Sequence, residues 1–214
     1  INIMHSSSLK KKFVIYCPQL VTGFNIRELI HYLREDADVE IEHHDILMSA
    51  ETAENILAYR KADLVATVVP VRNRSIICAP FKTIEGVLVC SSNHPRINAS
   101  STLKQVLEEQ FTSLLSEELG MKEYQSKTNE FMANRNIGFS SDSLISITNV
   151  ISSTDIIGII PRVIFEHYAP IFNLKEIDIG IKIPSAELFL MYNRASLNNS
   201  GFAEYIKRII PESE

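Results

Sequence analysis

The sequence predicts an α/β fold in which two Rossmann-like lobes are joined by two crossover strands. Short apolar runs alternate with amphipathic segments, a pattern typical of βαβ units around a largely parallel sheet. This pattern restarts after the apolar run 86–91, and a second isolated run at 187–192 can lead back to the first lobe. The chain has 214 residues, of which 45% are hydrophobic. It can therefore bury a core for each lobe.

The first lobe begins with three predicted strands. Each is an apolar run or alternates apolar with charged residues. They are residues 12–17, 39–43 and 63–68. Thr22 can cap a helix at 22–34, whose apolar residues have the i, i+3, i+4, i+7 spacing of one helix face. A second helix is expected at 52–59.

The second lobe repeats this order after the crossover run. The predicted strands are residues 111–115, 136–139 and 154–160, and the predicted helices are 103–110, 142–153 and 162–168. Ser141 or Asp142 can cap the helix at 142–153, with Leu144 and Ile147 on its inner face. A terminal helix is expected at 202–210. Lobe I is assigned to 11–88 with 190–214 and lobe II to 89–189, after a linker remnant at 1–10.

Charge and cysteine content restrict the function classes. The formal net charge is −5 and the only basic run is 10–12. A domain that binds DNA by itself is expected to carry a basic face. No apolar stretch reaches the roughly 20 residues that cross a bilayer, and the N-terminus lacks the features of a secretory signal. Cys17, Cys78 and Cys90 lie in or beside apolar strands, which indicates buried, reduced thiols in a cytosolic protein.

Enzyme signatures are lacking in the sequence. The seven glycines form neither G-x-G-x-x-G nor a P-loop, and no Gly-x-Ser-x-Gly elbow occurs. His43 and His44 are adjacent on a predicted strand, so their side chains should point to opposite faces and not chelate one metal. We therefore expect no catalytic residues, no metal and no cofactor.

Two cassettes carry a resemblance to a known family. In the first, the apolar strand 86–90 runs into Ser-Ser-Asn-His-Pro at 91–95; in the second, 136–162 reads strand, polar turn, amphipathic helix and strand, ending in Ile-Pro-Arg. Over residues 11–210 the chain resembles the effector-binding domain of LysR-type bacterial transcription regulators, and most of all the LeuO/NodD-like branch. The resemblance implies a type-II periplasmic binding protein-like fold and a structural role for His94.

The resemblance also implies a small-molecule effector held by the loops that follow the strands. In open α/β sheets, ligands bind beyond the carboxyl ends of the strands, near helix N-termini. The effector-binding residues expected on this basis are Pro18, Gln19, Thr22, Asp45, Met48, Thr67, Ser141, Asp142, Ser143 and Arg162. Ordinary turn and cap chemistry would also explain several of them, above all Ser141 and Asp142. The effector is expected to be anionic or, because 46–48 is apolar, partly apolar.

The partners follow from the same resemblance. It implies a homodimer in which the helix at 22–34 packs against the helix at 142–153 of a second copy, and the intact protein could form a tetramer. DNA would be bound through an N-terminal winged helix-turn-helix outside this chain. No membrane contact is expected, and the location is cytoplasmic. The alternatives are an extracytoplasmic solute-binding protein that delivers its ligand to a transporter and, third, an enzyme on the same two-lobed scaffold.

Overall fold

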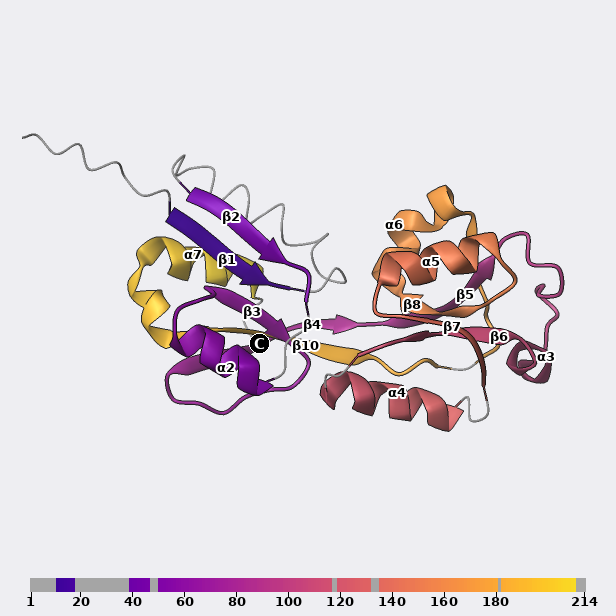
Figure 1. Cartoon of the computed structure of the whole chain (residues 1–214), viewed down its shortest axis with the longest axis horizontal. Helices are drawn as coiled ribbons and strands as arrows, with labels where there is room; N and C mark the ends of the chain where they lie inside the picture. The colour runs from indigo at the N-terminus through magenta and orange to yellow at the C-terminus, as the bar shows by residue number, and fades with distance from the viewer. Residues whose placement is uncertain are drawn as a thin grey trace, which may run out of the picture. The chain divides into compact units, whose positions relative to one another are not determined.

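The structure, a computed structural model, describes residues 11–17, 39–46, 50–116, 119–131, 135–180 and 182–210. The chain divides into two compact units: Ile1–Phe81 with Leu188–Glu214 form unit 1, and Lys82–Glu187 form unit 2. The chain changes units within strand β4 (Ile76–Ile84) and again within β10 (Ala186–Asn193), as Figure 1 shows. The predicted α/β fold with two crossover strands is therefore confirmed, and the lobe limits at 88/89 and 189/190 stay predictions.

Unit 1 contains a five-stranded sheet in the order β2-β1-β3-β10-β4. Strand β1 (Lys11–Tyr16) pairs in parallel with β2 (Val39–His44) and β3 (Leu64–Thr67), whereas β10 is antiparallel to β3. Helix α2 (Ala50–Ala58) packs Ala53 and Leu57 against Val65 and Met191. The unit thus combines three parallel strands with one strand that returns from unit 2.

Helix α7 (Ser200–Ile209) follows β10 and the 3-10 helix η1 (Arg194–Asn198). Asn199 caps it, since its side chain accepts a hydrogen bond from the backbone N–H of Phe202. The ring of Phe202 lies 6.1 Å from that of Phe13 and 5.5 Å from that of Tyr192. The terminal helix is therefore fastened to the sheet by an aromatic cluster.

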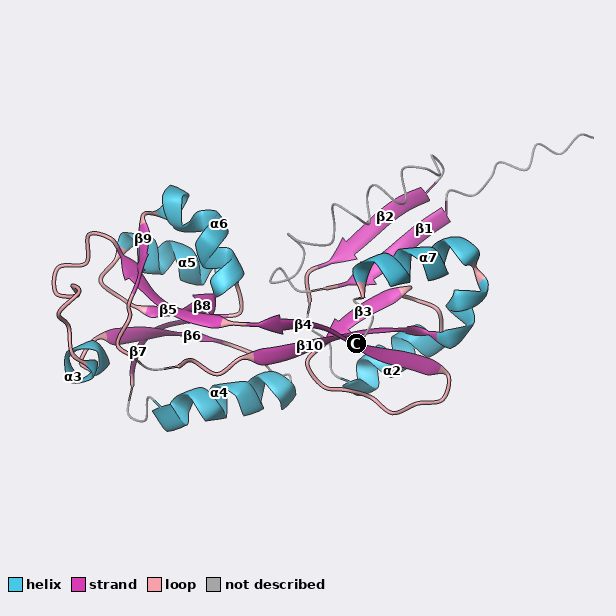
Figure 2. Cartoon of the chain, turned by 180° about the vertical axis from the view of Figure 1, so that it is seen from behind, coloured by secondary structure: helices cyan, strands magenta, loops and turns pink. Residues whose placement is uncertain are grey.

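Unit 2 builds its sheet from two ladders, β8-β5-β9 and β6-β7, seen in Figure 2. The strands are β5 (Gly86–Ser91), β6 (Gln110–Leu114), β7 (Asn136–Ser141), β8 (Gly158–Pro161) and β9 (Leu174–Glu176). A parallel bridge between Phe111 and Ile157 joins the ladders and gives the order β7-β6-β8-β5-β9. Because β5 is antiparallel to β8, this is the strand order of unit 1, with β5 in the place of β10.

Two apolar clusters cover the two faces of this sheet. Helices α5 (Leu144–Ser153) and α6 (Arg162–Phe172) pack on one face through a cluster that includes Val89, Ile147 and Ile164. The other face carries Leu88, Cys90 and Phe111, and the short helix α3 (Leu103–Leu107) contributes Val106. The alternation of Val89 with its neighbours Leu88 and Cys90 follows the two-residue period of a strand.

Four elements of the structure were not predicted: β4, β9, the 3-10 helix η1 and helix α4 (Leu119–Phe131). Pro80 and Lys82 interrupt the apolar pattern of β4, and β9 has only three residues. Helix α4 is mostly polar and carries no continuous apolar stripe. Helix 142–153 begins at Leu144 with Ser143 as its N-cap, so the expected cap at Ser141 or Asp142 was wrong. Within the described ranges, no helix combines the length and apolarity that a membrane span needs.

The turn after β5 is organised by His94, whose side chain is fully buried. Its Nδ1 accepts hydrogen bonds from the backbone N–H groups of Arg96 and Ile97, both at 3.1 Å. Its Nε2 lies 2.8 Å from the backbone oxygen of Asp155. Because Nδ1 accepts twice, the proton must be on Nε2, which donates to Asp155. These three hydrogen bonds give His94 a structural role in the turn, as the resemblance implied.

Candidate functional site: the carboxyl edges of the two sheets

In unit 1, the parallel strands bring Asp45 and Thr67 to one edge of the sheet. Tyr16 at the end of β1 pairs with His44 of β2 and with Val65 of β3, so the residues that follow leave the sheet together. Asp45 is exposed there. Thr67 is fully buried, and its hydroxyl both accepts from the backbone N–H and donates to the carbonyl of Val69. Of the two, Asp45 is the residue that solvent can reach.

The adjacent histidines of β2 have separate partners at this edge. Nε2 of His43 donates to the carbonyl of Cys17 at 2.8 Å. The ring of His44 stacks on Tyr16 with centroids 4.4 Å apart, and its Nε2 lies 2.7 Å from a carboxylate oxygen of Glu42. Among the described residues, no group of three or more His, Cys, Asp or Glu side chains is placed to hold a metal ion.

In unit 2, the carboxyl edge carries Ser141, Asp142, Ser143 and Arg162. Leu114 of β6 pairs with Ser141 of β7, and β8 runs parallel to β6 from the bridge at Ile157. The ends of all three strands therefore meet at one edge. Ser141 Oγ accepts from the N–H of Ser143 at 3.0 Å, and Ser143 Oγ accepts from the N–H of Ser146 at 3.2 Å. Both hydroxyls stabilise the helix start, and Asp142 between them is exposed.

Arg162 begins helix α6 and is engaged by two carboxylates. Its Nη1 and Nη2 donate to the two oxygens of Glu176 at 3.3 and 3.0 Å, and its Nε lies 3.4 Å from Glu85. The hydrogen bonds to Glu176 raise the pKa of Arg162. This bidentate pair joins the ends of β8 and β9. The contact with Glu85 also links Arg162 to the residue that precedes β5. The sequence contained no signal for either carboxylate partner.

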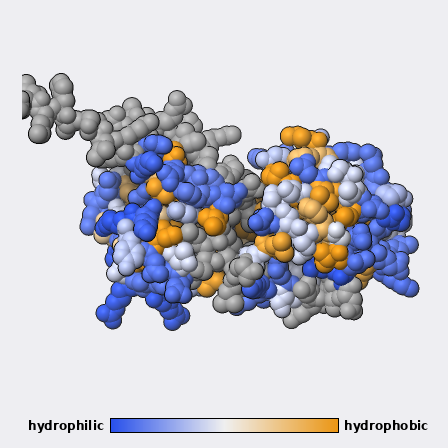
Figure 3. Space-filling model, viewed as in Figure 1, coloured by the Kyte–Doolittle hydropathy of each residue, from blue (hydrophilic) through white to orange (hydrophobic). Residues whose placement is uncertain are grey.

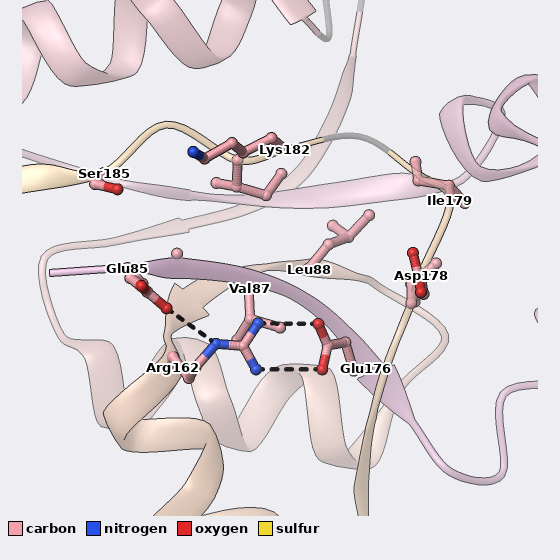
Figure 4. Close-up of a pocket in the computed structure, with 12 residues that line it drawn as sticks. Glu85, Val87, Leu88, Arg162, Glu176, Asp178, Ile179, Lys182 and Ser185 are labelled. Atoms are coloured by element: carbon pink, nitrogen blue, oxygen red, sulfur yellow. Dashed lines mark hydrogen bonds and ion pairs between the residues drawn. The ribbon is translucent and has the colours of Figure 1, made fainter.

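A hollow of about 250 Å³ opens beside Arg162, shown in Figure 4. It lies entirely in unit 2, between the start of β5, the β8–α6 junction and the segment 176–185. Its floor is apolar and its rim is charged. The lining residues are Glu85, Gly86, Val87, Leu88, Arg162, Glu176, Ile177, Asp178, Ile179, Lys182, Ile183 and Ser185. Only Arg162 belongs to the set expected from the sequence.

The other expected residues are placed as follows. Pro18, Gln19, Thr22 and Met48 lie outside the described residues. Asp45 and Thr67 lie at the carboxyl edge of unit 1, and the remaining four lie at that of unit 2. Their role in effector binding stays a prediction. Ser141 makes a turn contact, as the alternative explanation expected, but the cap contact is made by Ser143 and not by Ser141 or Asp142.

The three cysteines are thiols and form no disulfide. Cys17 and Cys90 are buried, as expected, whereas Cys78 is only partly buried. Burial raises the pKa of the Cys90 thiol to about 11 and also raises that of Cys78. Because the thiolate is the reactive form, these two positions are poorly suited to redox chemistry at neutral pH.

The family is settled by comparison with known proteins. The model of the LysR substrate binding domain matches residues 26–210. An uncharacterized HTH-type transcriptional regulator of Escherichia coli K12, YbdO, is 48% identical over 209 residues, which cover 98% of this chain and 70% of YbdO. The chain belongs to the LysR substrate-binding domain family. The resemblance found in the sequence is confirmed.

More distant relatives and solved structures are also regulators or regulatory domains. The E. coli K12 regulator LeuO is 24% identical over 152 residues, so the match covers 71% of this chain and 48% of LeuO. Among solved structures, a probable transcriptional regulator of Pseudomonas aeruginosa, PA0477, matches 95% of the chain and 68% of its own with a TM-score of 0.73 at 16% identity. The reduced regulatory domain of OxyR2 from Vibrio vulnificus matches 97% and 98% with a TM-score of 0.70 at 14% identity. These structures establish the fold.

Proposed function

We propose that this chain senses a small-molecule effector for a LysR-type transcription regulator and has no catalytic role. The effector would bind to the loops at the carboxyl edges of the two sheets. Binding would favour one of two arrangements of the regulator and so change how its DNA-binding domains are presented. DNA would be contacted through an N-terminal helix-turn-helix, and the protein would act in the cytoplasm.

The repeated strand order is the observation that carries this proposal. Units 1 and 2 each place three parallel strands beside one antiparallel strand, and each collects polar residues at the carboxyl ends of the parallel strands. Ligands of open α/β sheets bind at such edges. The relatives are HTH-type transcriptional regulators, which disfavours the alternative of a solute-binding protein that serves a transporter.

Thermal unfolding with a metabolite panel tests effector binding. A ligand at a hundred times its Kd should add about 2.7 kcal/mol, or roughly 5–10 °C in Tm for a chain of this size. Gln19→Ala and Ser141→Ala should each abolish the shift. Ser153→Ala is the matched control, because its hydroxyl caps a carbonyl at the opposite end of α5. A ligand that shifts both site variants as it shifts the wild type would show that these loops do not hold it.

We also propose a homodimer in which α5 packs against residues 22–34 of a second copy. Residues 22–34, for which a helix is predicted, lie outside the described residues. On α5, Ile145 and Val150 are only partly buried within unit 2, and Figure 3 shows apolar surface over α5 and α6. In such a dimer, α5 of each copy would contact residues 22–34 of the other copy. The two contacts would be related by a two-fold axis, so the assembly would close as a dimer. A tetramer of the intact protein would need a further interface.

Val150→Glu should convert this dimer to a monomer. A charge in the centre of a helix–helix contact would be buried without a partner, which weakens association strongly. Light scattering at micromolar concentration would report the mass, with 24.2 kDa for one chain. Ser126→Glu, an exposed position on α4, should leave the mass unchanged. A monomeric wild type would contradict the proposal directly.

A further inference from the structure

We infer that the hollow in unit 2 is a binding pocket in its own right and that it takes a small polar molecule with a protonated amine. All of its lining residues belong to unit 2. The pocket therefore does not depend on loops of both units acting together. It shares Arg162 and the carboxyl edge of unit 2 with the effector site proposed above, but its other lining residues are not among those expected for that site.

The position of the hollow favours ligand binding. It lies beside the β8–α6 junction, at the edge where the parallel strands of unit 2 end, and this is where open α/β sheets bind ligands. Val87 and Leu88 are each 2% exposed and point to opposite faces of β5, so the apolar wall beside Asp178 and Ile179 comes from Leu88, while Val87 lies on the side of Arg162. A volume of about 250 Å³ is slightly below the range of drug-sized sites, which begins at about 300 Å³. A small molecule of a few carbon atoms suits it.

The charges at the rim favour a cation. Three carboxylates, Glu85, Glu176 and Asp178, face two cationic residues, Arg162 and Lys182. The guanidinium of Arg162 is already held bidentately by Glu176, at 3.0 and 3.3 Å. An anionic ligand at Arg162 would have to displace that carboxylate. The anion-binding capacity of the only expected effector residue in this pocket is therefore largely used within the protein.

Two carboxylates retain the capacity to accept an amine. Glu85 is 65% exposed in its side chain and meets Arg162 through one contact of 3.4 Å. Asp178 accepts from the N–H of Gly180 at 3.1 Å, which uses one of about four acceptor positions on a carboxylate. In Figure 4 the ammonium group of Lys182 points away from Asp178. An amine can thus approach Asp178 with its carbon chain over Leu88 and Ile179.

Nuclear magnetic resonance titration of the whole chain tests this pocket with three probes. Pentylammonium, pentanoate and pentanol share one apolar tail and differ in charge. Pentylammonium should shift the backbone signals of Gly86, Leu88 and Ile179 at millimolar concentration, with a Kd at least about fivefold lower than that of pentanoate. High salt should weaken the interaction, because exposed charges are screened.

Variants distinguish specific binding of an amine in this pocket from non-specific binding to the surface. Asp178→Asn should raise the Kd of pentylammonium about three- to fivefold, and Lys182→Gln should lower it about twofold by removing a like charge. Glu123→Gln, an exposed carboxylate on α4, should change nothing. Neither Asp178 nor Lys182 contacts Arg162 in an ion pair, so the fold should persist.

The inference is overturned if pentanoate binds more tightly than pentylammonium, or if Asp178→Asn leaves the Kd of pentylammonium unchanged. Absence of shifts at Gly86, Leu88 and Ile179 with all three probes would also overturn it. Such a result leaves the effector proposal standing. That proposal concerns the loops after the parallel strands and is tested through Gln19 and Ser141.

Discussion

Gly158→Ala is expected to lower the free energy of unfolding by about 3 kcal/mol, at the upper end of the usual cost of overpacking. Gly158 is buried at the start of β8. A Cβ atom there would collide with Oγ1 of Thr112 and lie 3.0 Å from Cδ1 of Ile151. Thr112 is 5% exposed and Ile151 fully buried, so neither can move into solvent. Urea unfolding followed by circular dichroism would measure the loss.

A double variant identifies the cause of that loss. Thr112→Ala removes the hydroxyl that the new methyl group would meet, so adding it to Gly158→Ala should restore more than half of the lost stability. Gly138→Ala is the control, because the three atoms nearest to its Cβ would all belong to the exposed side chain of Gln110, whose amide can turn into solvent and whose Cβ, at 3.1 Å, needs to shift only slightly. It should cost less than about 1 kcal/mol. If Gly158→Ala has the same free energy of unfolding as the wild type, β6 and β8 are not packed as described.

The elements that sequence could predict are those with a strong apolar period. Helix α5 was expected because Leu144, Ile147 and Ile151 recur at helical spacing, and all three are buried. Its start was misplaced because three polar residues in succession can each cap a helix, and only the backbone path selects Ser143. Helix α4 has no such period; among its described side chains, Thr128 is buried and the hydroxyl of Tyr124 lies close to Gly86.

The candidate site also contains residues that the sequence could predict and residues that it could not. Topology alone places Asp45, Ser141 and Arg162 after parallel strands, since the ends of such strands share an edge. The partners of Arg162 could not be predicted in this way. Glu85 precedes an antiparallel strand and Glu176 ends a three-residue strand, so no local pattern marks either as a site residue. Side chains far apart in sequence become a site only through the packing of β5 between β8 and β9.

The two units share a strand order although their sequences do not repeat. In each, the antiparallel strand next to the three parallel ones follows a crossing from the other unit; it is β10 in unit 1 and β5 in unit 2. Each sheet is therefore completed by a strand that the other half of the chain delivers.

His94→Ala is expected to lower the free energy of unfolding by about 2–4 kcal/mol, because it removes three hydrogen bonds and leaves a cavity. The N–H groups of Arg96 and Ile97 and the carbonyl of Asp155 would lose their partner, the buried imidazole. The ion pairs of Arg96 with Glu109 and Asp155 cross the same region. These ion pairs cannot replace the imidazole, because they join side chains, whereas the imidazole serves backbone N–H and carbonyl groups.

The exposed histidine of α6 provides the control. His167→Ala should change the free energy of unfolding by no more than about 0.5 kcal/mol, as is usual at the surface, when both variants are compared in urea at pH 7. A functional histidine would give the reverse result: normal stability and an altered ligand response. His94→Ala with wild-type stability would therefore refute the structural role that its two-acceptor, one-donor geometry assigns to it.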